Sequence, residues 1–424
     1  MRDPFARRDG ALHAEGVPLA AIAEAVGTPV YVYSATRLCE AYDALDAAFA
    51  GVPHLICYAL KSCMNLAVVR TLVARGAGAD VTSGGELLRA LRAGAPPERI
   101  VYSGVGKTDA EIDRALDARI KAFNVESRAE LRRIDARAAA RGVVADIAFR
   151  VNPDVDPKTH PYISTGLRTS KFGVPIAEAL EAYAEAKTLE HVRVMGVDCH
   201  IGSQIVDVQP FADALDRVRA LTLELRRAGH RIDMIDVGGG LGVTYADERP
   251  PGAEDYAAAV RGAVGDLGCE IVLEPGRWIT ANAGILLIRV LYEKQVEEKR
   301  FVVVDGAMND LIRPALYRSY QQIEPVGPPR GGERPVDVVG PVCESADFLA
   351  RDRSLPRVER GDLLAVRSAG AYGFAMASNY NARPRPAEVL VRGGRYAVVR
   401  ERESLEDLLR GESIPRELTE AEAP

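Results

Sequence analysis

The 424-residue sequence lacks a long hydrophobic run, an excess of positive charge and a paired cysteine motif. No stretch reaches the roughly 18 uninterrupted apolar residues of a membrane-spanning helix. The N-terminal stretch MRDPFARRDG has no apolar segment of the kind found in signal peptides. The net charge of −6 indicates no basic surface for nucleic acid. We therefore expect neither a membrane segment nor a nucleic-acid partner.

The cysteines are also arranged without the spacing of a metal or disulfide site. The six stand at positions 39, 57, 63, 199, 269 and 343, and no two form a CxxC pair. A zinc site or a disulfide framework would need closer, patterned spacing. Scattered cysteines are typical of reduced thiols in a cytoplasm. We expect a cytoplasmic protein with no metal centre.

Short apolar runs alternate with longer amphipathic stretches through the first two thirds of the chain. The eight runs cover residues 54–61, 77–83, 98–104, 121–127, 145–152, 194–203, 232–240 and 270–278. Strands that are apolar on both faces and separated by helices predict a parallel sheet. Eight such repeats favour an α/β fold of the TIM (β/α)8 barrel type over an open sheet.

The pattern changes after residue 280. Strand-like runs follow one another with little helix between them, at 285–294, 300–306, 336–343, 362–368 and 388–400. The last run has Gly393-Gly394 at its centre, which predicts a hairpin turn. We expect a second, mostly antiparallel β-sandwich or β-barrel domain, and we expect the early strand VYVYS (30–34) to join it. The Pro- and Gly-rich stretches 325–335 and 381–386 are predicted as surface loops.

These patterns divide the chain into three parts. Residues 1–40 form an N-terminal segment that joins the β domain, residues 41–280 form the barrel, and residues 281–424 form the C-terminal β domain. Active sites of TIM barrels lie at the carboxyl ends of the strands. The ends of the predicted strands are unusually rich in polar residues and glycine: Lys61, Asp80, Arg150, Asn152, His200, Ser203, Gly238 to Gly240, Glu274, Gly276 and Arg277.

Three glycines follow the seventh predicted strand, at Gly238, Gly239 and Gly240. Glycine allows backbone N–H groups to crowd around an anion, and a phosphate site commonly forms after strands seven and eight of such barrels. A tight loop without a ligand is the alternative. The spacing does not match a dinucleotide-binding fingerprint.

Lys61 ends a predicted strand that is otherwise apolar. Strand alternation places Leu55, Cys57, Ala59 and Lys61 on one face, which we expect to be the barrel interior. A desolvated lysine has a lowered pKa and becomes an amine nucleophile. A solvated strand end is the alternative for an isolated lysine. A lysine opposite a phosphate loop instead favours pyridoxal phosphate held as a Schiff base.

Glu274 fits the same hypothesis, because a carboxylate beside the pyridine nitrogen keeps that nitrogen protonated. The alternative for Glu274 is an ion pair with neighbouring Arg277, which could equally bind a substrate carboxylate. His200 is expected to stack on the cofactor ring, or else to be structural. Ser203 could donate a hydrogen bond to the phosphate.

These residues stand in motifs that occur together in one known family. The motifs are YALK, ADVTSGGEL, NPDVDPKTHPYISTGLRTSKFG (152–173), HIGSQ, DVGGGLG, EPGR, NDLIRPALY (309–317) and CESAD (343–347). Over nearly its whole length the sequence resembles the fold-type III pyridoxal-phosphate decarboxylases. The 152–173 segment, NDLIRPALY and CESAD are the most specific motifs. One small departure is Ser62, directly after the lysine.

The resemblance implies pyridoxal 5′-phosphate as cofactor and assigns residues to it. The implied catalytic residues are Lys61, which carries the cofactor, and Cys343, the proton donor. The implied cofactor-binding residues are Lys61, Asp80, His200, Ser203, Gly238, Gly239, Gly240, Glu274, Gly276, Arg277 and Tyr372. The implied substrate-binding residues are Arg277, Arg313, Tyr317, Glu344 and Tyr372.

The resemblance also implies a substrate and an assembly. It is closest to the branch that converts meso-2,6-diaminoheptanedioate into L-lysine and CO2, the last step of bacterial lysine biosynthesis. A substrate whose distal end bears both a carboxylate and an ammonium group needs a cation and an anion, and Arg313 and Glu344 would supply them. In this family Cys343, Glu344 and Tyr372 are expected to reach the site of a partner subunit, which implies a homodimer with shared active sites.

Four alternatives remain open at this point. The same chemistry could act on ornithine, lysine or arginine, although ornithine would leave Arg313 without a partner. A racemase of the same barrel has no use for CESAD. A catalytically inactive carrier of the cofactor would not need Lys61 and Cys343. A barrel that uses an unmodified phosphorylated substrate would be colourless.

Overall fold

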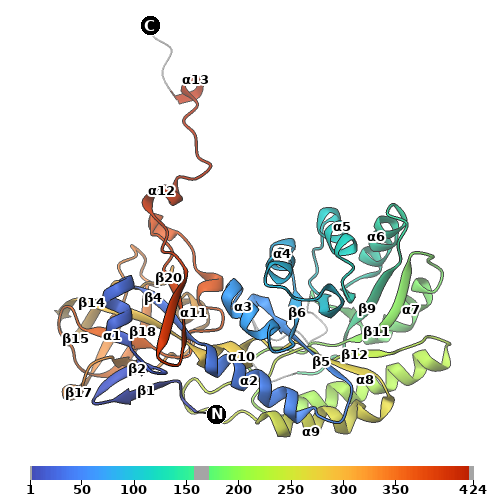
Figure 1. Ribbon diagram of the computed structural model, residues 1–424, viewed down its shortest axis with the longest axis horizontal. Helices are drawn as coiled ribbons and strands as arrows, with labels where there is room; N and C mark the ends of the chain where they lie inside the picture. Colours follow the sequence, from blue (N-terminus) through green and yellow to red (C-terminus); the bar gives the residue numbers. More distant parts are fainter. Residues whose placement is uncertain (1, 157–170, 420–424) are drawn as a thin grey trace.

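The computed structural model describes residues 2–156 and 171–419 and contains a closed parallel barrel beside a second sheet domain (Figure 1). Most of the distinctive segment 152–173 lies outside the described residues, so that motif has no structural account. The barrel strands are β5 (His54–Ala59), β6 (Gly78–Val81), β7 (Ile100–Tyr102), β8 (Ala122–Val125), β9 (Ala145–Asn152), β11 (Val192–Asp198), β12 (Met234–Asp236) and β13 (Glu270–Leu273).

The barrel closes because its first and last strands pair. Each strand pairs in parallel with the next, and β13 pairs with β5 through Val272 and Leu55. The short β10 (Val174–Pro175) adds to β9 from outside this ring. The predicted TIM-type barrel is therefore confirmed, with all eight predicted runs contributing a strand.

Helices cover the outside of the barrel between consecutive strands (Figure 1). They are α2 (Ala35–Ala48), α3 (Leu66–Val73), α4 (Gly84–Arg92), α5 (Asp109–Ala118), α6 (Arg128–Ala139), α7 (Ala179–Ala186), α8 (Gln209–Arg227) and α9 (Ala253–Val264). Their starts follow from local sequence. At α5, for example, Thr108 and Glu111 form a capping box, in which the Thr108 N–H donates to Glu111 Oε2 at 3.0 Å.

Small and medium apolar side chains fill the barrel interior. Leu55 and Cys57 are fully buried there with residues of five other strands, in a cluster completed by Val101, Ala122, Ala148, Met234 and Val272. The alternate residues Ile56 and Tyr58 instead pack in the larger core that includes the helices. The filled interior leaves the strand ends as the place where a ligand could bind.

The second domain is built on one sheet with the strand order β18-β17-β15-β14-β4-β20-β21, to which β19 and β16 add beside β14. Its strands are β4 (Val30–Ser34), β14 (Gly284–Val296), β15 (Lys299–Val304), β16 (Ile323–Pro325), β17 (Arg330–Val339), β18 (Phe348–Arg357), β19 (Leu363–Val366), β20 (Ala387–Arg392) and β21 (Arg395–Arg400). Most pairs are antiparallel, as predicted, while β4–β20 and β15–β17 are parallel. The early strand VYVYS is β4 and lies between β14 and β20, which confirms that it joins this domain.

One predicted loop is largely strand. The stretch 325–335 contains the end of β16 and the first half of β17, and β17 pairs antiparallel with β18. The prediction failed because a long partner strand, β18, satisfies the backbone of this Pro- and Gly-rich stretch. Strand β18 itself was not predicted, nor was the small N-terminal sheet of β1 (Phe5–Arg8), β2 (Ala11–Ala14) and β3 (Val17–Pro18), which precedes α1 (Leu19–Val26).

The barrel and the β domain meet at the carboxyl ends of the barrel strands. After β13 the chain turns through α10 (Arg277–Thr280) directly into β14. The Tyr372 N–H, in a β-domain loop, donates to the Ser62 carbonyl at 2.7 Å, just after the barrel strand β5. Helix α11 (Arg313–Tyr317) also comes from the β domain, and its residues Arg313 and Tyr317 line the same cavity as the barrel residues at this boundary.

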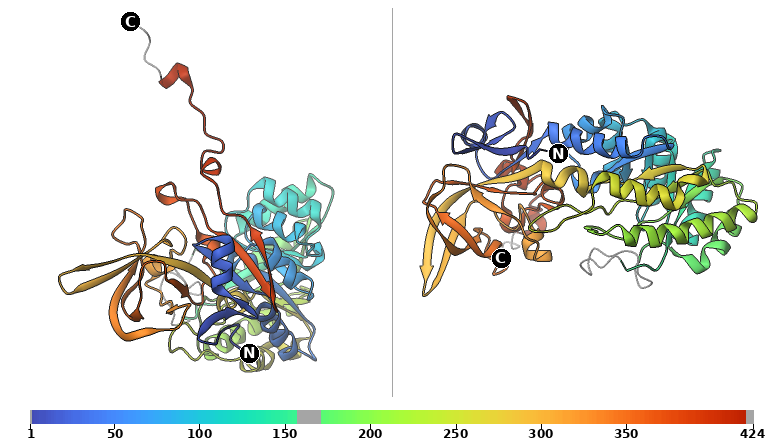
Figure 2. Two further views of the ribbon diagram at one scale, coloured as in Figure 1. Left: turned by 60° about the vertical axis from the view of Figure 1, so that its left-hand side comes forward. Right: turned by 90° about the horizontal axis from the view of Figure 1, so that it is seen from below.

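The chain ends in a segment that leaves the body of the molecule. Helices α12 (Leu405–Leu408) and α13 (Arg416–Thr419) project away from both domains (Figures 1 and 2). Among the described helices, none has the length and apolar character needed to cross a membrane.

Candidate active site

A cavity of about 500 Å3 lies at the carboxyl ends of the barrel strands, where the β domain covers them. Sequence-predicted residues from five segments line it: Lys61, His200, Ser203, Glu274, Arg277, Arg313, Tyr317 and Tyr372. A smaller recess beside it is lined by Gly238 to Gly240 and Gly276, together with several of the same residues. The fold therefore brings together most of the residues that the sequence indicated.

Lys61 lies at the floor of this cavity in a short 3-10 turn. Strand β5 ends at Ala59, and Leu60–Ser62 form the turn, so the alternation argument does not extend to Lys61. Its Nζ lies 3.2 Å from Asp80 Oδ2, and 36% of the lysine side chain is exposed, against none of the Asp80 side chain.

The prediction of a lowered pKa for Lys61 is wrong for this protein. Burial disfavours the ammonium group, but the nearby Asp80 and Glu274 carboxylates outweigh burial and raise the pKa of Lys61. Asp80 uses only one of its oxygens in this pair, since its Oδ1 has no hydrogen-bond partner in the described part of the chain. Lys61 is therefore a charged amine held in place by a neighbouring strand.

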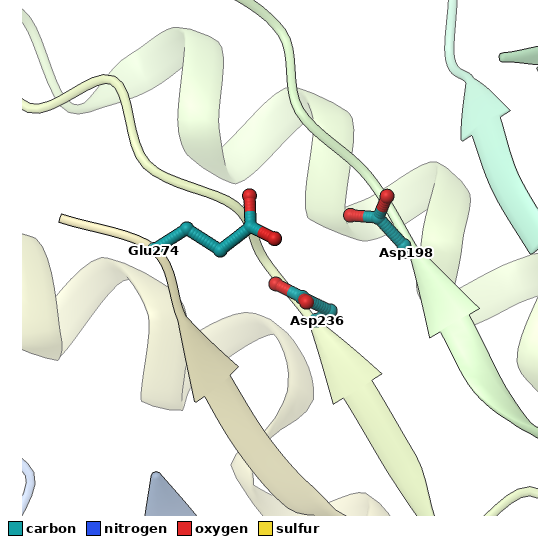
Figure 3. A group of neighbouring side chains, drawn as sticks. All are labelled: Asp198, Asp236 and Glu274. Carbon is teal, nitrogen blue, oxygen red and sulfur yellow. The ribbon is translucent and has the colours of Figure 1, made fainter. Parts of the chain in front are cut away.

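Three carboxyl groups, one of which is Glu274, lie together at the ends of neighbouring strands (Figure 3). Asp198, Asp236 and Glu274 come from the ends of β11, β12 and β13, and their nearest oxygens lie within 4.8 Å of one another. All three are buried. Asn124 joins two of them, because its amide donates to Asp236 Oδ2 at 3.1 Å and to Glu274 Oε1 at 3.3 Å.

Burial and mutual repulsion keep protons on this cluster. Burial, followed by the charge of Asp80, raises the pKa of Glu274 to about 7. Burial, reinforced by Glu274, likewise raises the pKa of Asp236, and the same two causes raise that of Asp198. A positively charged group beside Glu274 would reverse this balance and stabilise the carboxylate. The cluster can therefore exchange a proton with a cationic ligand near neutral pH.

His200 is a neutral ring in the cavity wall. Burial, and then the charges of Arg150 and Lys61, lower its pKa well below the ordinary value. The Gly239 N–H donates to His200 Nδ1 at 3.1 Å, so the acceptor role of Nδ1 assigns the proton of the neutral ring to Nε2.

The glycine loop is tight for a steric reason. A Cβ at Gly239 would lie 2.2 Å from the Glu274 carbonyl oxygen, and Gly240 has a φ of +110° with the Gly202 carbonyl 2.6 Å from its Cβ position. The Gly238 and Gly239 N–H groups bond Asp236 and His200. The Gly240 N–H, which has no acceptor among the described residues, remains available for a ligand at the recess.

Arg277 does not pair with Glu274, which excludes that alternative for both side chains. Its Nη2 donates to Ser203 Oγ at 2.9 Å and its Nη1 to the Tyr245 hydroxyl at 2.6 Å. Its guanidinium carbon lies 4.9 Å from the Tyr372 ring centre. The cation is thus held by hydroxyls and aromatic faces.

Arg313 shares this aromatic wall. Its guanidinium carbon lies between 5.5 and 5.8 Å from the ring centres of Tyr245, Tyr317 and Tyr372. The side chain is buried, and its Nε has no hydrogen-bond partner among the described residues. Burial, together with the charge of Arg277, lowers its pKa.

Two buried cations therefore face one cavity, and neither pairs with a carboxylate of the described chain. In the described part of the chain, no carboxylate lies within ion-pair distance of Arg277 or Arg313. Burying a cation without a partner is costly unless a ligand completes the site. The arrangement is that of a receptor for one or two anionic groups.

Cys343 and Glu344 lie outside this cavity. Both are exposed on the loop after β17, and the Cys343 N–H donates to Asn381 Oδ1 at 2.8 Å. Tyr372, in contrast, lines the cavity of its own chain. The expectation that Tyr372 reaches a partner's site is wrong, because its backbone bond to Ser62 fixes it beside Lys61.

Several residues of the site were missed. Ser103, Asn124, Asp198 and Asp236 all stand at or near the carboxyl ends of strands, and that position alone could have indicated them. Tyr245, which holds Arg277, lies in an irregular loop after β12, and no sequence pattern distinguishes it.

Comparison with known proteins places this site in a family. The pyridoxal-binding domain of the pyridoxal-dependent decarboxylases matches residues 36–281, which include the whole barrel. This chain belongs to the pyridoxal-dependent decarboxylases. It is an α/β decarboxylase, and its cofactor is pyridoxal phosphate.

Relatives within the family are similar over almost their full lengths. A diaminopimelate decarboxylase of Pseudomonas aeruginosa is 53% identical, covering 97% of this chain and 99% of the relative. The crystal structure of diaminopimelate decarboxylase from M. jannaschii in complex with L-lysine has a TM-score of 0.94 at 40% identity, covering 98% and 99% of the two chains. The Helicobacter pylori enzyme, also with L-lysine, has a TM-score of 0.90 at 44% identity, covering 92% and 98%.

The residues of the cavity fit the cofactor of this family. The cavity offers one amine at Lys61, a glycine-lined recess with a free backbone donor at Gly240, and a buried carboxyl at Glu274 that a cationic ring nitrogen would ionise. A Cβ at Gly239 would clash with the Glu274 carbonyl oxygen and would therefore change the shape of the recess. The aldehyde, the phosphate and the ring nitrogen of pyridoxal phosphate therefore each have a chemically matched partner.

Proposed function

We propose that this protein decarboxylates meso-2,6-diaminoheptanedioate to L-lysine and CO2, the last step of bacterial lysine biosynthesis. The observation that carries the proposal is Arg313, a buried guanidinium with an unsatisfied Nε that faces the cavity. The proposal is also supported by relatives named diaminopimelate decarboxylase and by neighbours that bind L-lysine.

The distal carboxylate of the substrate is the natural partner of this cation. Arg313 and Arg277 share an aromatic wall and face the same cavity as Lys61. A bidentate guanidinium–carboxylate contact would satisfy the free Nε of Arg313. Ornithine has no distal carboxylate, so it would leave a buried, unpaired charge, which costs several kcal/mol. Tyr317 and Tyr372 would complete the substrate pocket.

The cofactor, when bound, withdraws electrons from the carbon that loses its carboxylate. Lys61 would carry it covalently, with Asp80 orienting the amine. Glu274 would hold the proton on the ring nitrogen, and His200, which is uncharged, would lie against the ring face. The Gly240 N–H would bind the phosphate, together with the other residues of the recess: Ser203, Gly238, Gly239, Gly276, Arg277 and Tyr372.

Asp198 and Asp236 would support Glu274 rather than touch the reacting atoms. Their buried carboxyl groups lie within 4.8 Å of Glu274, and Glu274 in turn raises the pKa of both. Asn124 holds one oxygen of Asp236 and one of Glu274 close together, because its amide donates to both.

Two assigned residues require a second subunit. Cys343, the proposed proton donor to Cα, and Glu344, the proposed partner of the distal ammonium, are exposed and lie away from their own cavity. We infer that they act in the cavity of a partner subunit, so that the enzyme is a homodimer with shared active sites. We also propose that the enzyme is cytoplasmic.

A substrate panel tests the proposal directly. With cofactor present, CO2 release is expected from meso-2,6-diaminoheptanedioate and not from ornithine, lysine or arginine. Inactivity on meso-2,6-diaminoheptanedioate would refute the proposed substrate. Activity on ornithine would favour the alternative that the same chemistry acts on a different amino acid. Borohydride reduction and peptide mapping should place a covalent label on Lys61, whereas an unlabelled Lys61 points to a phosphorylated substrate instead.

Arg313→Gln tests the observation that carries the proposal. The glutamine removes the charge but keeps a hydrogen-bond donor, so kcat/KM for meso-2,6-diaminoheptanedioate should fall by about 100-fold or more, from loss of a buried charge-assisted contact of about 3 kcal/mol. Arg318→Gln, at the end of the same helix, is the matched control. An unchanged kcat/KM in Arg313→Gln would remove Arg313 from substrate binding.

A further inference from the structure

Residues 404–419 form an arm that makes no hydrogen bond to the rest of the described chain. From Ser404 to Thr419, every hydrogen bond of this segment joins two of its own residues. We call residues 404–419 the C-terminal arm. It extends away from both domains in Figure 1 and in the left-hand view of Figure 2.

The arm exposes large apolar side chains. Leu405, Leu409, Ile414 and Leu418 are between 63% and 82% exposed, more than any other large hydrophobic residue of the described chain. Leu405 and Leu409 are four residues apart in the sequence, as are Ile414 and Leu418, which gives two apolar pairs along the arm. Apolar groups gathered in this way are typical of a contact surface.

The arm is also acidic. It contains four acidic residues against two arginines. Asp407 is used inside the arm, where it caps α12 and pairs with Arg410. Glu406 and Glu412 form no ion pair among the described residues. The arm thus combines leucine side chains with unpaired negative charge.

A groove on the body of the molecule has the opposite charge. It has a volume of about 510 Å3 and lies between α3 and the hairpin β20–β21. We call it the basic groove, and its lining residues are Arg70, Thr71, Ala74, Leu390, Arg392, Arg395, Tyr396, Ala397 and Val399. None of its three arginines forms an ion pair in the described part of the chain, although the protein as a whole is acidic.

One side of the basic groove is an open sheet edge. Strand β21 is the last strand in the sheet order, so its outer backbone groups face no neighbouring strand. Tyr396 and Val398 on this strand are 38% and 37% exposed. An open edge with apolar side chains requires a cover or it promotes association. A segment that is apolar and carries the opposite charge is complementary to such an edge and can bind there.

The root of the arm directs it away from its own groove. Glu403 is fixed to the body, because its Oε1 accepts from Arg385 Nε at 2.7 Å and its Oε2 from Asn379 Nδ2 at 2.7 Å. Reaching the groove of the same chain would require the arm to reverse direction directly after this anchor. The arm can reach the same groove on a second molecule without reversing its direction.

We propose that the C-terminal arm of one copy of this chain docks in the basic groove of a second copy. The leucines contact Leu390, Tyr396 and Val399, and the glutamates face Arg392 and Arg395. The contact covers the open edge of β21 and removes the apolar arm from water. It does not depend on the reaction proposed above.

Photo-crosslinking in the full-length protein tests the contact without assuming a register. We replace Leu409 with p-benzoylphenylalanine and irradiate the purified protein. A covalent dimer is expected, with the crosslinked peptide from residues 70–74 or 390–399. The same replacement at Tyr292, which is 58% exposed at the far end of β14, is the control and should give no such peptide.

Each other outcome contradicts the proposal. A crosslink within one chain, seen as a labelled monomer, would assign the groove to its own arm. A dimer crosslinked elsewhere would exclude the groove, and no crosslink would exclude the contact. Decarboxylation is measured on the same samples, so failure of the arm contact and failure of the proposed activity are separate results.

Charge reversal tests the basis of recognition. Arg392→Glu with Arg395→Glu should abolish the crosslinked dimer, and adding Glu406→Arg with Glu412→Arg should restore it. Arg231→Glu, at a side chain that is 87% exposed outside the groove, should leave the dimer unchanged. A dimer that persists in the groove variant would overturn the role of these arginines.

Discussion

At the scale of single residues, Lys61 depends on neighbours that are distant in sequence. Strand alternation indicated a desolvated amine with a lowered pKa, but Asp80 on the next strand lies 3.2 Å away and reverses the direction. The presence of a reactive lysine could be predicted from the strand-end position. Its charge could not, because that depends on which carboxylates the barrel places around it.

Asp80→Asn should make Lys61 reactive at lower pH. Attachment of pyridoxal phosphate needs the neutral amine, and an opposite charge at this distance raises a lysine pKa by about one to three units. The pH profile of the attachment rate, followed by visible absorbance, should therefore move down by at least about one pH unit. Asp146→Asn, at an exposed pair with Arg193, is the control. An unmoved profile would show that Asp80 does not set the charge of Lys61.

Glu274 makes the cofactor-free protein sensitive to alkaline pH. Its folded pKa of about 7 lies above the unfolded value, so the protonated group favours folding. This contribution is complete below about pH 4 and is lost as pH rises through about 7. Glu274→Gln should therefore raise the free energy of unfolding of the cofactor-free protein at pH 8.5 by roughly 2–3 kcal/mol. Urea unfolding measures this change as a higher midpoint. At pH 5 the effect should be much smaller.

Glu270→Gln, on the same strand but partly exposed, is the matched control for this measurement. An equal gain at both pH values would mean that the substitution acts through packing rather than through proton binding. With cofactor bound, the gain at pH 8.5 should disappear, because a cationic ring nitrogen stabilises the carboxylate.

At the scale of elements, the turn after β12 is fixed by steric contact with its neighbour. Gly239→Ala would place a methyl group 2.2 Å from the Glu274 carbonyl oxygen. The backbone must move, so we expect a loss of about 1–3 kcal/mol in stability and weaker cofactor binding. Thermal unfolding and cofactor titration measure the two effects. Gly262→Ala, which meets open space on α9, should be neutral or slightly stabilising.

Most strands and helices of the barrel could be predicted, because their apolar periodicity is local. The stretch 325–335 shows the limit of that reasoning. Its Pro and Gly content is typical of a loop, yet half of it pairs with β18, a strand whose mixed charges gave no alternating pattern. Pairing with a distant strand outweighed local composition there.

At the scale of the whole molecule, the proposed sharing of active sites between two copies can be tested with mixed variants. Lys61→Ala and Cys343→Ala should each be inactive alone. Mixed and allowed to exchange subunits, they should regain part of the activity, because one combination carries both intact residues in one cavity. Cys39→Ala, outside the cavity, should remain active without mixing. Failure to regain activity would place Cys343 in the cavity of its own chain or outside catalysis.

The boundaries at residues 40 and 280 stay a prediction, although β4 clearly pairs with strands from the far end of the chain. That pairing is why the cavity has walls from both domains. Arg313 and Tyr372 come from the β domain and face Lys61 on the barrel.

The sequence by itself determined the parallel barrel, the β domain, the lysine, the glycine loop and the family. These follow from local periodicity and from motifs that are contiguous in the chain. Only the tertiary structure decided the charge of Lys61, the carboxyl cluster of Asp198, Asp236 and Glu274, and the unpaired state of Arg313. The reason is physical: each of these properties is an interaction between side chains from different strands, and its sign depends on distance and burial that exist only after the chain has folded.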